Sequence, residues 1–277
     1  MNLSRTTKKI IMYLFLTAGA LVMLVPFAWM ILTAFKTKSE AISVNPFYIF
    51  PQNGWHFENF TEVWNSYNFL VLYGNTLLMI VLRVVFACLT ATLAGYAFAR
   101  LEFPFKKFFF SLILIQMMVP GQIFIIPQYL MVSKLHVLNT QIALLFPGMV
   151  TAFGTYLCKQ NYQRLPASLA EAAELDGCSI PQQFLYIMLP LTKSSLVSLS
   201  IFTALFAYKD LMWSMVVCPK PEATTLTAAL SKIQGQFTNN YPQVMAGAAM
   251  AVVPMLVIYF AFQKNFVEGI ATSGGKL

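Results

Sequence analysis

The chain has 277 residues, of which 58% are hydrophobic and only 10% are charged, and its mean hydropathy is +0.67. Soluble domains carry about 25% charged residues, so this composition excludes an ordinary soluble protein and indicates a membrane protein. The net charge of +8 does not point to nucleic-acid binding, because the basic residues lie at the ends of apolar runs, as in membrane loops.

Six apolar segments approach the roughly 20 residues that a helix needs to cross a bilayer. They lie at about 10–32, 70–99, 108–130, 142–157, 196–217 and 244–262. The first follows Arg5, Lys8 and Lys9 but exceeds the apolar core of a signal peptide and has no small-residue cleavage site, so we expect an uncleaved span. The sequence therefore predicts an all-α, polytopic membrane protein with six transmembrane helices.

The distribution of basic residues predicts a plasma-membrane protein with both termini in the cytoplasm. The predicted inside segments hold 11 lysines and arginines: Arg5, Lys8, Lys9, Arg100, Lys106, Lys107, Lys159, Arg164, Lys193, Lys264 and Lys276. The predicted outside loops hold 5: Lys36, Lys38, Lys134, Lys220 and Lys232. We expect one transmembrane domain over 1–277, made of the first span and an external loop (1–69), five core spans (70–266) and a cytoplasmic tail (267–277).

The cytoplasmic loop at 165–191 predicts two short helices. Pro166 suits a helix start, and residues 167–175 are good helix formers. Gly177 suits the left-handed position that ends a helix, and Ser179 with Gln182 forms a capping box for a second helix that Pro190 would terminate. We therefore expect a helix pair joined by a sharp glycine turn.

Acidic residues make this loop unusual. Glu171, Glu174 and Asp176 are three of the ten acidic residues of the chain, in a loop where basic residues normally dominate. The side chains of Ala172 and Ala173 beside them are small, so the backbone of another protein could approach closely. The loop either links two spans or is a docking surface.

Several ordered motifs resemble the permeases of ABC importers, most closely the MalG-type sugar permeases. The run Glu171-Ala172-Ala173, then Gly177 and Leu189-Pro190, resembles their EAA loop, and the name EAA loop is used below for residues 165–191. Further resemblances are Asn75-Thr76-Leu77, Tyr96-Ala97-Phe98-Ala99-Arg100, Pro120-Gly121-Gln122, Phe237, Met245-Ala246-Gly247 and Phe266-Val267-Glu268-Gly269.

The resemblance implies a permease subunit that moves a carbohydrate, most simply an oligosaccharide, by alternating access. It also implies a heterodimer with a second, MalF-like permease, two ATP-binding subunits and an extracytoplasmic solute-binding protein. By resemblance, Glu171, Ala172, Ala173, Glu174, Asp176 and Gly177 would couple to the ATPase, and Leu189 and Pro190 would fix the second helix against the spans. ATP and Mg²⁺ would be bound by the partners, since this chain ends in a GGKL sequence that departs from a phosphate-binding loop.

Three charged residues fall within predicted spans: Arg83, Lys209 and Asp210. Tyr208, which directly precedes Lys209, is a further candidate for the pore. Charges at mid-bilayer are costly unless paired or hydrated, so they are functional candidates. Counting residues from the span ends places Arg83 and Asp210 at similar depth. The sequence allows either a structural Arg83–Asp210 pair or a surplus cation that faces the pathway and binds an acidic saccharide.

Other functions have weaker support in the sequence. Cys88, Cys158, Cys178 and Cys218 show no paired spacing, and neither they nor the two histidines indicate a metal site. No catalytic cluster supports an enzyme. A permease for a glycerol-phosphate or polyol solute remains an alternative, as does an ion-coupled secondary transporter, for which Asp210 would be the only intramembrane carboxylate.

Overall fold

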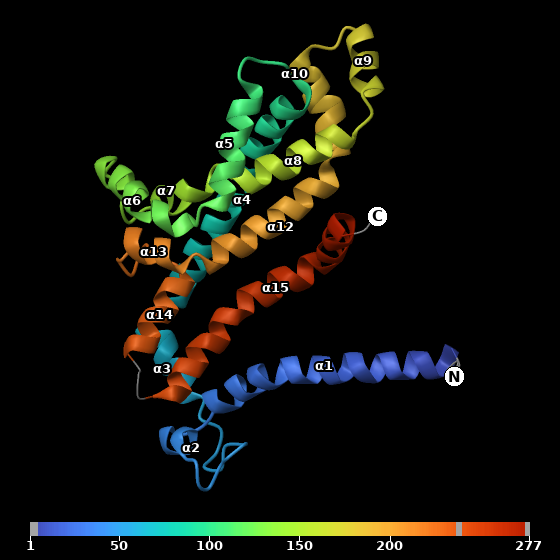
Figure 1. Cartoon of the computed structure of the whole chain (residues 1–277). Helices are drawn as coiled ribbons and strands as arrows, with labels where there is room; N and C mark the ends of the chain where they lie inside the picture. The colour runs from blue at the N-terminus through green and yellow to red at the C-terminus, as the bar shows by residue number, and fades with distance from the viewer. Residues whose placement is uncertain (1–4, 237–239, 275–277) are drawn as a thin grey trace. The chain divides into compact units, whose positions relative to one another are not determined.

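The computed structural model describes residues 5–236 and 240–274, and these residues form helices and the segments that connect them (Figure 1). This confirms the predicted all-α fold. The helices are α1 (Arg5–Ala34), α2 (Lys38–Ile42), α3 (Glu58–Ser66), α4 (Phe69–Arg100), α5 (Lys106–Met118), η1 (Gly121–Phe124), α6 (Ile125–Lys134), α7 (Gln141–Leu145), η2 (Phe146–Gly148), α8 (Ala152–Arg164), α9 (Ser168–Leu175), α10 (Ile180–Gln182), η3 (Gln183–Met188), α11 (Leu189–Leu191), α12 (Lys193–Lys209), α13 (Leu211–Val217), α14 (Leu226–Gln236) and α15 (Tyr241–Gly274).

Three of the described helices are long and apolar enough to cross a membrane without a break: α1, α4 and the Tyr241–Phe260 part of α15. Three more candidate spans are bent pairs of helices. The pairs are α5 with η1 and α6, bent by 102°, α7 and η2 with α8, bent by 48°, and Ile180–Leu191 with α12, bent by 75°. Six spans result if each bent pair crosses once.

The third predicted span is wrong as a continuous helix over 108–130. Helix α5 ends at Met118, and the chain turns by 102° before α6. Val119 is extended, the conformation that a residue before proline prefers, and Pro120 has no N–H to continue the helix. The helix is therefore broken at Pro120-Gly121.

The fifth predicted span is likewise broken. Helix α12 begins at Lys193 and ends at Lys209, and α13 starts at Leu211. Asp210 lies between them with non-helical backbone angles (φ −76°, ψ 72°). The break leaves the Asp210 carboxylate free to bond with another helix, as described below.

The C-terminal helix is longer than the predicted sixth span. Helix α15 continues through the expected tail boundary at residue 267 and reaches Gly274. Phe237 and the last three residues of the GGKL sequence lie outside the described residues.

The chain divides into two compact units, and each is described by itself. Unit 1 comprises residues 1–69 and 229–255, and unit 2 comprises residues 70–228 and 256–277. In unit 1, the segment that follows α1 is organised around Glu40, which is 4% exposed. Its carboxylate accepts bonds from the backbone amides of Thr37, Gln52 and Asn53 at 2.8–2.9 Å.

These bonds control the ionisation of Glu40. Burial alone would raise the pKa of its carboxyl group, but the backbone donors and the Thr37 side chain stabilise the charged form and lower the pKa to about 2. Nearby, the Lys36 ammonium is buried, donates to the Tyr48 carbonyl at 2.8 Å and lies 4.0 Å from the centre of the Trp29 ring. The segment between α1 and α3 is therefore held by specific polar contacts as well as by aromatic contacts such as the stacked Trp29 and Phe47 rings.

Two hydrophobic clusters lie among the described residues of unit 2. The membrane-depth cluster joins α4, α6, α7, α12 and α13 through residues such as Met79, Leu144 and Trp213. The loop-side cluster consists of Ala91, Tyr96, Cys158, Tyr162, Phe184, Met188 and Leu199. Helices α4 and α8 approach closely at Gly95, where a Cβ atom would lie 2.5 Å from Cys158 Cβ and 2.8 Å from the Lys159 backbone nitrogen.

Candidate functional site

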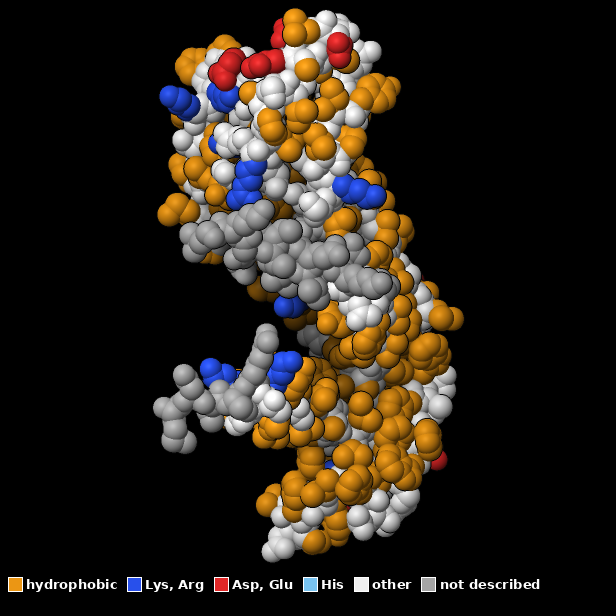
Figure 2. Space-filling view, turned by 90° about the vertical axis from the view of Figure 1, so that its right-hand side faces the viewer, with side chains coloured by type: hydrophobic (Ala, Val, Ile, Leu, Met, Phe, Trp, Pro, Cys, Tyr) orange, Lys and Arg blue, Asp and Glu red, His pale blue; other side chains and the backbone are white. Residues whose placement is uncertain are grey.

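The first helix of the EAA loop is α9, and its acidic side chains are exposed. Glu171, Glu174 and Asp176 all lie on the surface, whereas Ala173 is only 4% exposed. Figure 2 shows acidic side chains gathered at the end of unit 2 that α9 occupies in Figure 1. Ala172 is therefore exposed beside the acidic side chains, and Ala173 faces inward.

Gly177 ends α9 in the way that its sequence position predicts. Its φ is +79°, a left-handed conformation that favours glycine. The Gly177 amide donates to the Glu174 carbonyl at 3.0 Å, and the Cys178 amide donates to the Ala173 carbonyl at 2.9 Å. These two bonds form a Schellman motif, which fixes the direction in which the chain leaves α9.

The second helix of the loop starts with the predicted capping box. The Ser179 amide donates to Gln182 Oε1 at 2.8 Å. The helix then widens into a π-helical turn, η3, and ends at Leu191, one residue after Pro190. In the π turn the Leu189 amide bonds to the Phe184 carbonyl. No pattern in the sequence predicts this widening. Pro190, which follows η3, lacks the N–H that a regular α-helical bond would need.

The loop is attached to the spans through the loop-side cluster. Phe184 and Met188 of η3 are buried, and the Phe184 ring lies 5.2 Å from that of Tyr96 on α4. Tyr96 in turn lies 5.7 Å from Tyr162 on α8. Leu169 and Ala170 of α9 and Leu189 of α11 pack against the same cluster. Helix α9 is thus connected to α4, α8 and α12 by direct packing.

Arg83 and Asp210 meet at the break between α12 and α13. Arg83 Nη1 and Asp210 Oδ2 are 2.8 Å apart, and the two side chains are 6% and 25% exposed. Arg83 Nε donates to the Leu144 carbonyl at 2.9 Å, and Nη2 donates to the same oxygen. The Arg83 side chain also packs against Gly148, where a Cβ atom would lie 2.6 Å from Arg83 Cδ. Arg83 therefore ties α4 to α7, η2 and Asp210.

Lys209 is not part of this pair. It is exposed and, with Asp210, lines a cavity of about 530 Å³ beside the helix breaks. Gln122, Gln128, Phe206 and Trp213 also line the cavity. Tyr208 instead packs against the membrane-depth cluster. Amides, an ammonium group and aromatic rings can together bind the hydroxyl groups and flat faces of a polar ligand.

Sequence reasoning missed Gln128 and Phe206 as lining residues, because the cavity exists only where the third and fifth segments break. It also missed the cap that Asn75 places on the loop before α14. Asn75 Nδ2 donates to the carbonyls of Glu222 and Thr224 at 2.8 and 3.1 Å. Among the described residues, no group of three or more His, Cys, Asp or Glu side chains forms a candidate metal site.

Comparison with known proteins gives consistent results. Residues 91–272 match the family described as "Binding-protein-dependent transport system inner membrane component". The chain is 30% identical over 279 residues to the arabinooligosaccharides transport system permease protein AraQ of Halalkalibacterium halodurans, covering 99% of this chain and 100% of AraQ. It is also 30% identical over 224 residues to the sn-glycerol-3-phosphate transport system permease protein UgpE of Salmonella typhi, covering 78% and 80% of the two chains.

A solved structure shares the fold. A chain of a bacterial ABC transporter involved in the import of the acidic polysaccharide alginate superposes with a TM-score of 0.78 and covers 95% of this chain and 99% of its own. Its sequence is 21% identical.

Proposed function

Because the chain belongs to the family of inner-membrane components of binding-protein-dependent transport systems, we propose that it is the permease subunit of an ATP-driven importer for an oligosaccharide. It is a multi-pass inner-membrane permease of an ABC transporter and not itself an ATPase. The observation that carries the proposal for the substrate class is the match over almost the whole chain to a permease for arabinooligosaccharides.

In this proposal the chain pairs with a second, MalF-like permease, and two ATP-binding subunits dock beneath the pair. An extracytoplasmic binding protein delivers the carbohydrate, and both termini of the chain lie in the cytoplasm. Glu171, Glu174 and Asp176, exposed at the end of unit 2, face basic or polar groups of an ATPase subunit. The concentration of exposed acidic residues on α9 supports this arrangement.

The packing supports a mechanism of alternating access. Closure of the ATPase subunits would displace α9, and the loop-side cluster would pass that displacement to α4, α8 and α12. Gly177 would keep the turn between α9 and α10, while Leu189 and Pro190 would hold the second helix against the spans. The chain then acts as a lever and supplies no bond-breaking chemistry.

Reconstitution tests the proposal. The chain is co-expressed with its partner permease and ATPase subunits, purified by a tag on this chain and placed in liposomes with its binding protein. We expect the subunits to co-purify and labelled arabinooligosaccharide or a related oligosaccharide to enter only with ATP inside. Uptake by the isolated chain without ATP would show a secondary transporter and contradict the proposal.

A second candidate substrate is sn-glycerol-3-phosphate, because the chain is 30% identical to UgpE. The same liposomes separate the two candidates when labelled oligosaccharide and labelled glycerol phosphate are supplied in turn. Accumulation of glycerol phosphate alone would replace the carbohydrate assignment but keep the importer.

We also propose that the cavity beside the helix breaks contacts the substrate and that Lys209 favours acidic saccharides. Arg83 is already bonded to Asp210 and Leu144, whereas Lys209 is exposed in the cavity. Lys209→Asn should reduce uptake of uronic-acid oligosaccharides relative to neutral ones, with Lys220→Asn as an exposed control of equal charge change. An unchanged preference would contradict a substrate role for Lys209.

A further inference from the structure

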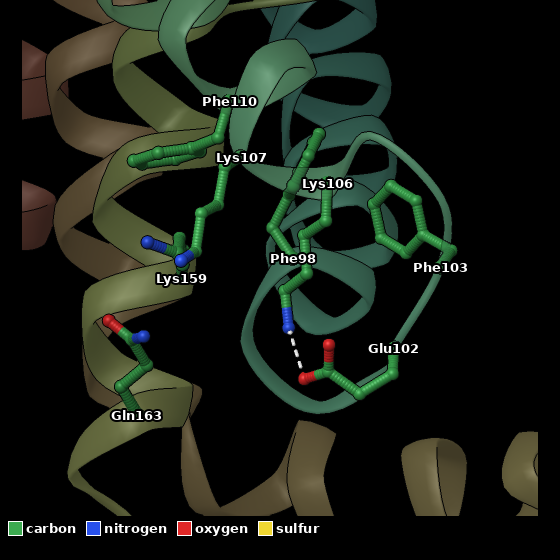
Figure 3. Close-up of a pocket in the computed structure, with 8 residues that line it drawn as sticks. All are labelled: Phe98, Glu102, Phe103, Lys106, Lys107, Phe110, Lys159 and Gln163. Atoms are coloured by element: carbon green, nitrogen blue, oxygen red, sulfur yellow. Dashed lines mark hydrogen bonds and ion pairs between the residues drawn. The ribbon is translucent and has the colours of Figure 1, made fainter.

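A second cavity, of about 420 Å³, lies where α4 ends, α5 begins and α8 makes its last turns (Figure 3). We call it the lysine pocket. It is lined by Phe98, Glu102, Phe103, Lys106, Lys107, Phe110, Lys159 and Gln163. It belongs to unit 2 and lies at the same end of α4 and α8 as the EAA loop, away from the Lys209 cavity.

The pocket carries an excess of positive charge. Lys106 pairs with Glu102 at 2.9 Å and also donates to the Leu101 carbonyl at 2.7 Å. Lys159 lies 3.6 Å from the centre of the Phe110 ring. In the part of the chain that the structure describes, Lys107 and Lys159 have no carboxylate partner. Three lysines and one glutamate leave two positive charges in the pocket.

The placement of these charges opposes the usual preference of a helix. Lys106 and Lys107 occupy the first turn of α5, where the helix dipole favours negative groups, and that turn has no acidic residue. Phe105, which precedes the helix, has a left-handed backbone and provides no side-chain cap. An anion in the pocket would satisfy both the lysines and the helix N-terminus.

The backbone of Lys159 is held by close helix packing. Lys159 is held at the point where α8 meets Gly95 of α4, since no side chain separates the two helices there. Figure 3 shows Lys107 and Lys159 reaching toward the same part of the pocket from α5 and α8. The pocket therefore presents ammonium groups from two helices to one ligand.

The surface beside the pocket is apolar. Helix α5 has no buried residue, and Phe105, Phe108 and Phe109 are 76%, 59% and 47% exposed. Such a surface at the end of a transmembrane helix faces lipid. Basic pockets between transmembrane helices at this level bind anionic headgroups.

We propose that the lysine pocket binds the phosphate of an anionic phospholipid, with the acyl chains lying along the exposed face of α5. A phospholipid headgroup and a soluble phosphate would both present a phosphate group to the pocket. The adjoining apolar face of α5 favours the lipid. This assignment requires a membrane-embedded chain and is independent of which solute the importer carries.

Native mass spectrometry of the assembled, detergent-purified transporter tests the assignment. The complex is titrated with phosphatidylglycerol and, separately, with phosphatidylcholine of the same acyl chains. We expect tight binding of one or more phosphatidylglycerol molecules, and Lys107→Gln/Lys159→Gln should weaken it about 30-fold, which corresponds to about 2 kcal/mol. Lys107→Arg/Lys159→Arg should restore it.

The control is Arg164→Gln/Lys193→Gln, which removes two exposed charges at the same end of unit 2 outside the pocket. Its phosphatidylglycerol affinity should stay within about threefold of the wild type, since surface charges outside the pocket contribute little. Equal losses in both double variants would show a general charge effect and overturn the site. Displacement of phosphatidylglycerol by millimolar inorganic phosphate would show a site for a soluble anion and overturn the lipid assignment.

Discussion

Replacing Arg83 with methionine should destabilise unit 2 by about 3–5 kcal/mol, the range for breaking a buried ion pair. The variant leaves the Asp210 carboxylate, 25% exposed, without its partner, and the Leu144 carbonyl loses the donors that Arg83 supplies. Asp210→Asn keeps the shape but removes a charged acceptor, which costs about 2–3 kcal/mol. The double variant should cost no more than Arg83→Met alone, giving a coupling energy of about 2–3 kcal/mol.

The tryptophan positions provide the assay. Trp213 is 2% exposed and donates to the Ala143 carbonyl at 2.9 Å, close to the ion pair, whereas Trp29, Trp55 and Trp64 all belong to unit 1. With those three replaced by phenylalanine, Trp213 fluorescence follows unfolding of unit 2 during titration with a denaturing detergent. Lys209→Asn is the control and should change the unfolding free energy by less than about 0.5 kcal/mol. A coupling energy below about 0.5 kcal/mol would refute the reasoning.

Three further predictions concern other parts of the molecule. In the liposome assay, Gly177→Val should lower uptake per ATP hydrolysed roughly tenfold, because the left-handed backbone at this position costs a branched residue about 1–2 kcal/mol. The control, Gly177→Asn, should stay near wild type in the same assay. Glu40→Gln should reduce the stability of unit 1 by about 3 kcal/mol near neutral pH, as judged by protease protection. Because the Glu40 pKa is lowered from 4.5 to about 2, the carboxylate stabilises the fold above pH 4.5, and the difference between wild type and variant should shrink as the pH falls toward 2; a constant difference would contradict this. Gly95→Val should destabilise unit 2 by about 1–3 kcal/mol and lower its melting temperature, because the valine side chain would meet the α8 backbone. An unchanged melting temperature would show that the two helices can separate there.

Local signals in the sequence predicted local structure well. The turn at Gly177 and the capping box of Ser179 depend on residues within a few positions of one another, so their patterns can be read directly. The similar depth of Arg83 and Asp210 also followed from residue counting, and the structure places their charged groups 2.8 Å apart.

Features that depend on tertiary packing could not be read in the same way. Hydropathy finds apolar residues whether or not the helix is continuous. It therefore predicts uninterrupted spans through Pro120 and Asp210, where the structure has breaks. The meeting of Gln128 and Phe206 in one cavity depends on those breaks. The lysine pocket depends on the close approach at Gly95, which only the fold reveals.

The π-helical turn η3 has a consequence for helical phase. Compared with an α-helix, a π turn contains one additional residue, and each residue of an α-helix corresponds to about 100° of rotation. The stretch that begins at Ile180 is therefore rotated by about that angle relative to the stretch that enters α12. Deleting a single residue from η3 would turn α9 toward a different side of the spans. The orientation of the acidic surface therefore depends on this widened turn together with the 75° bend before α12.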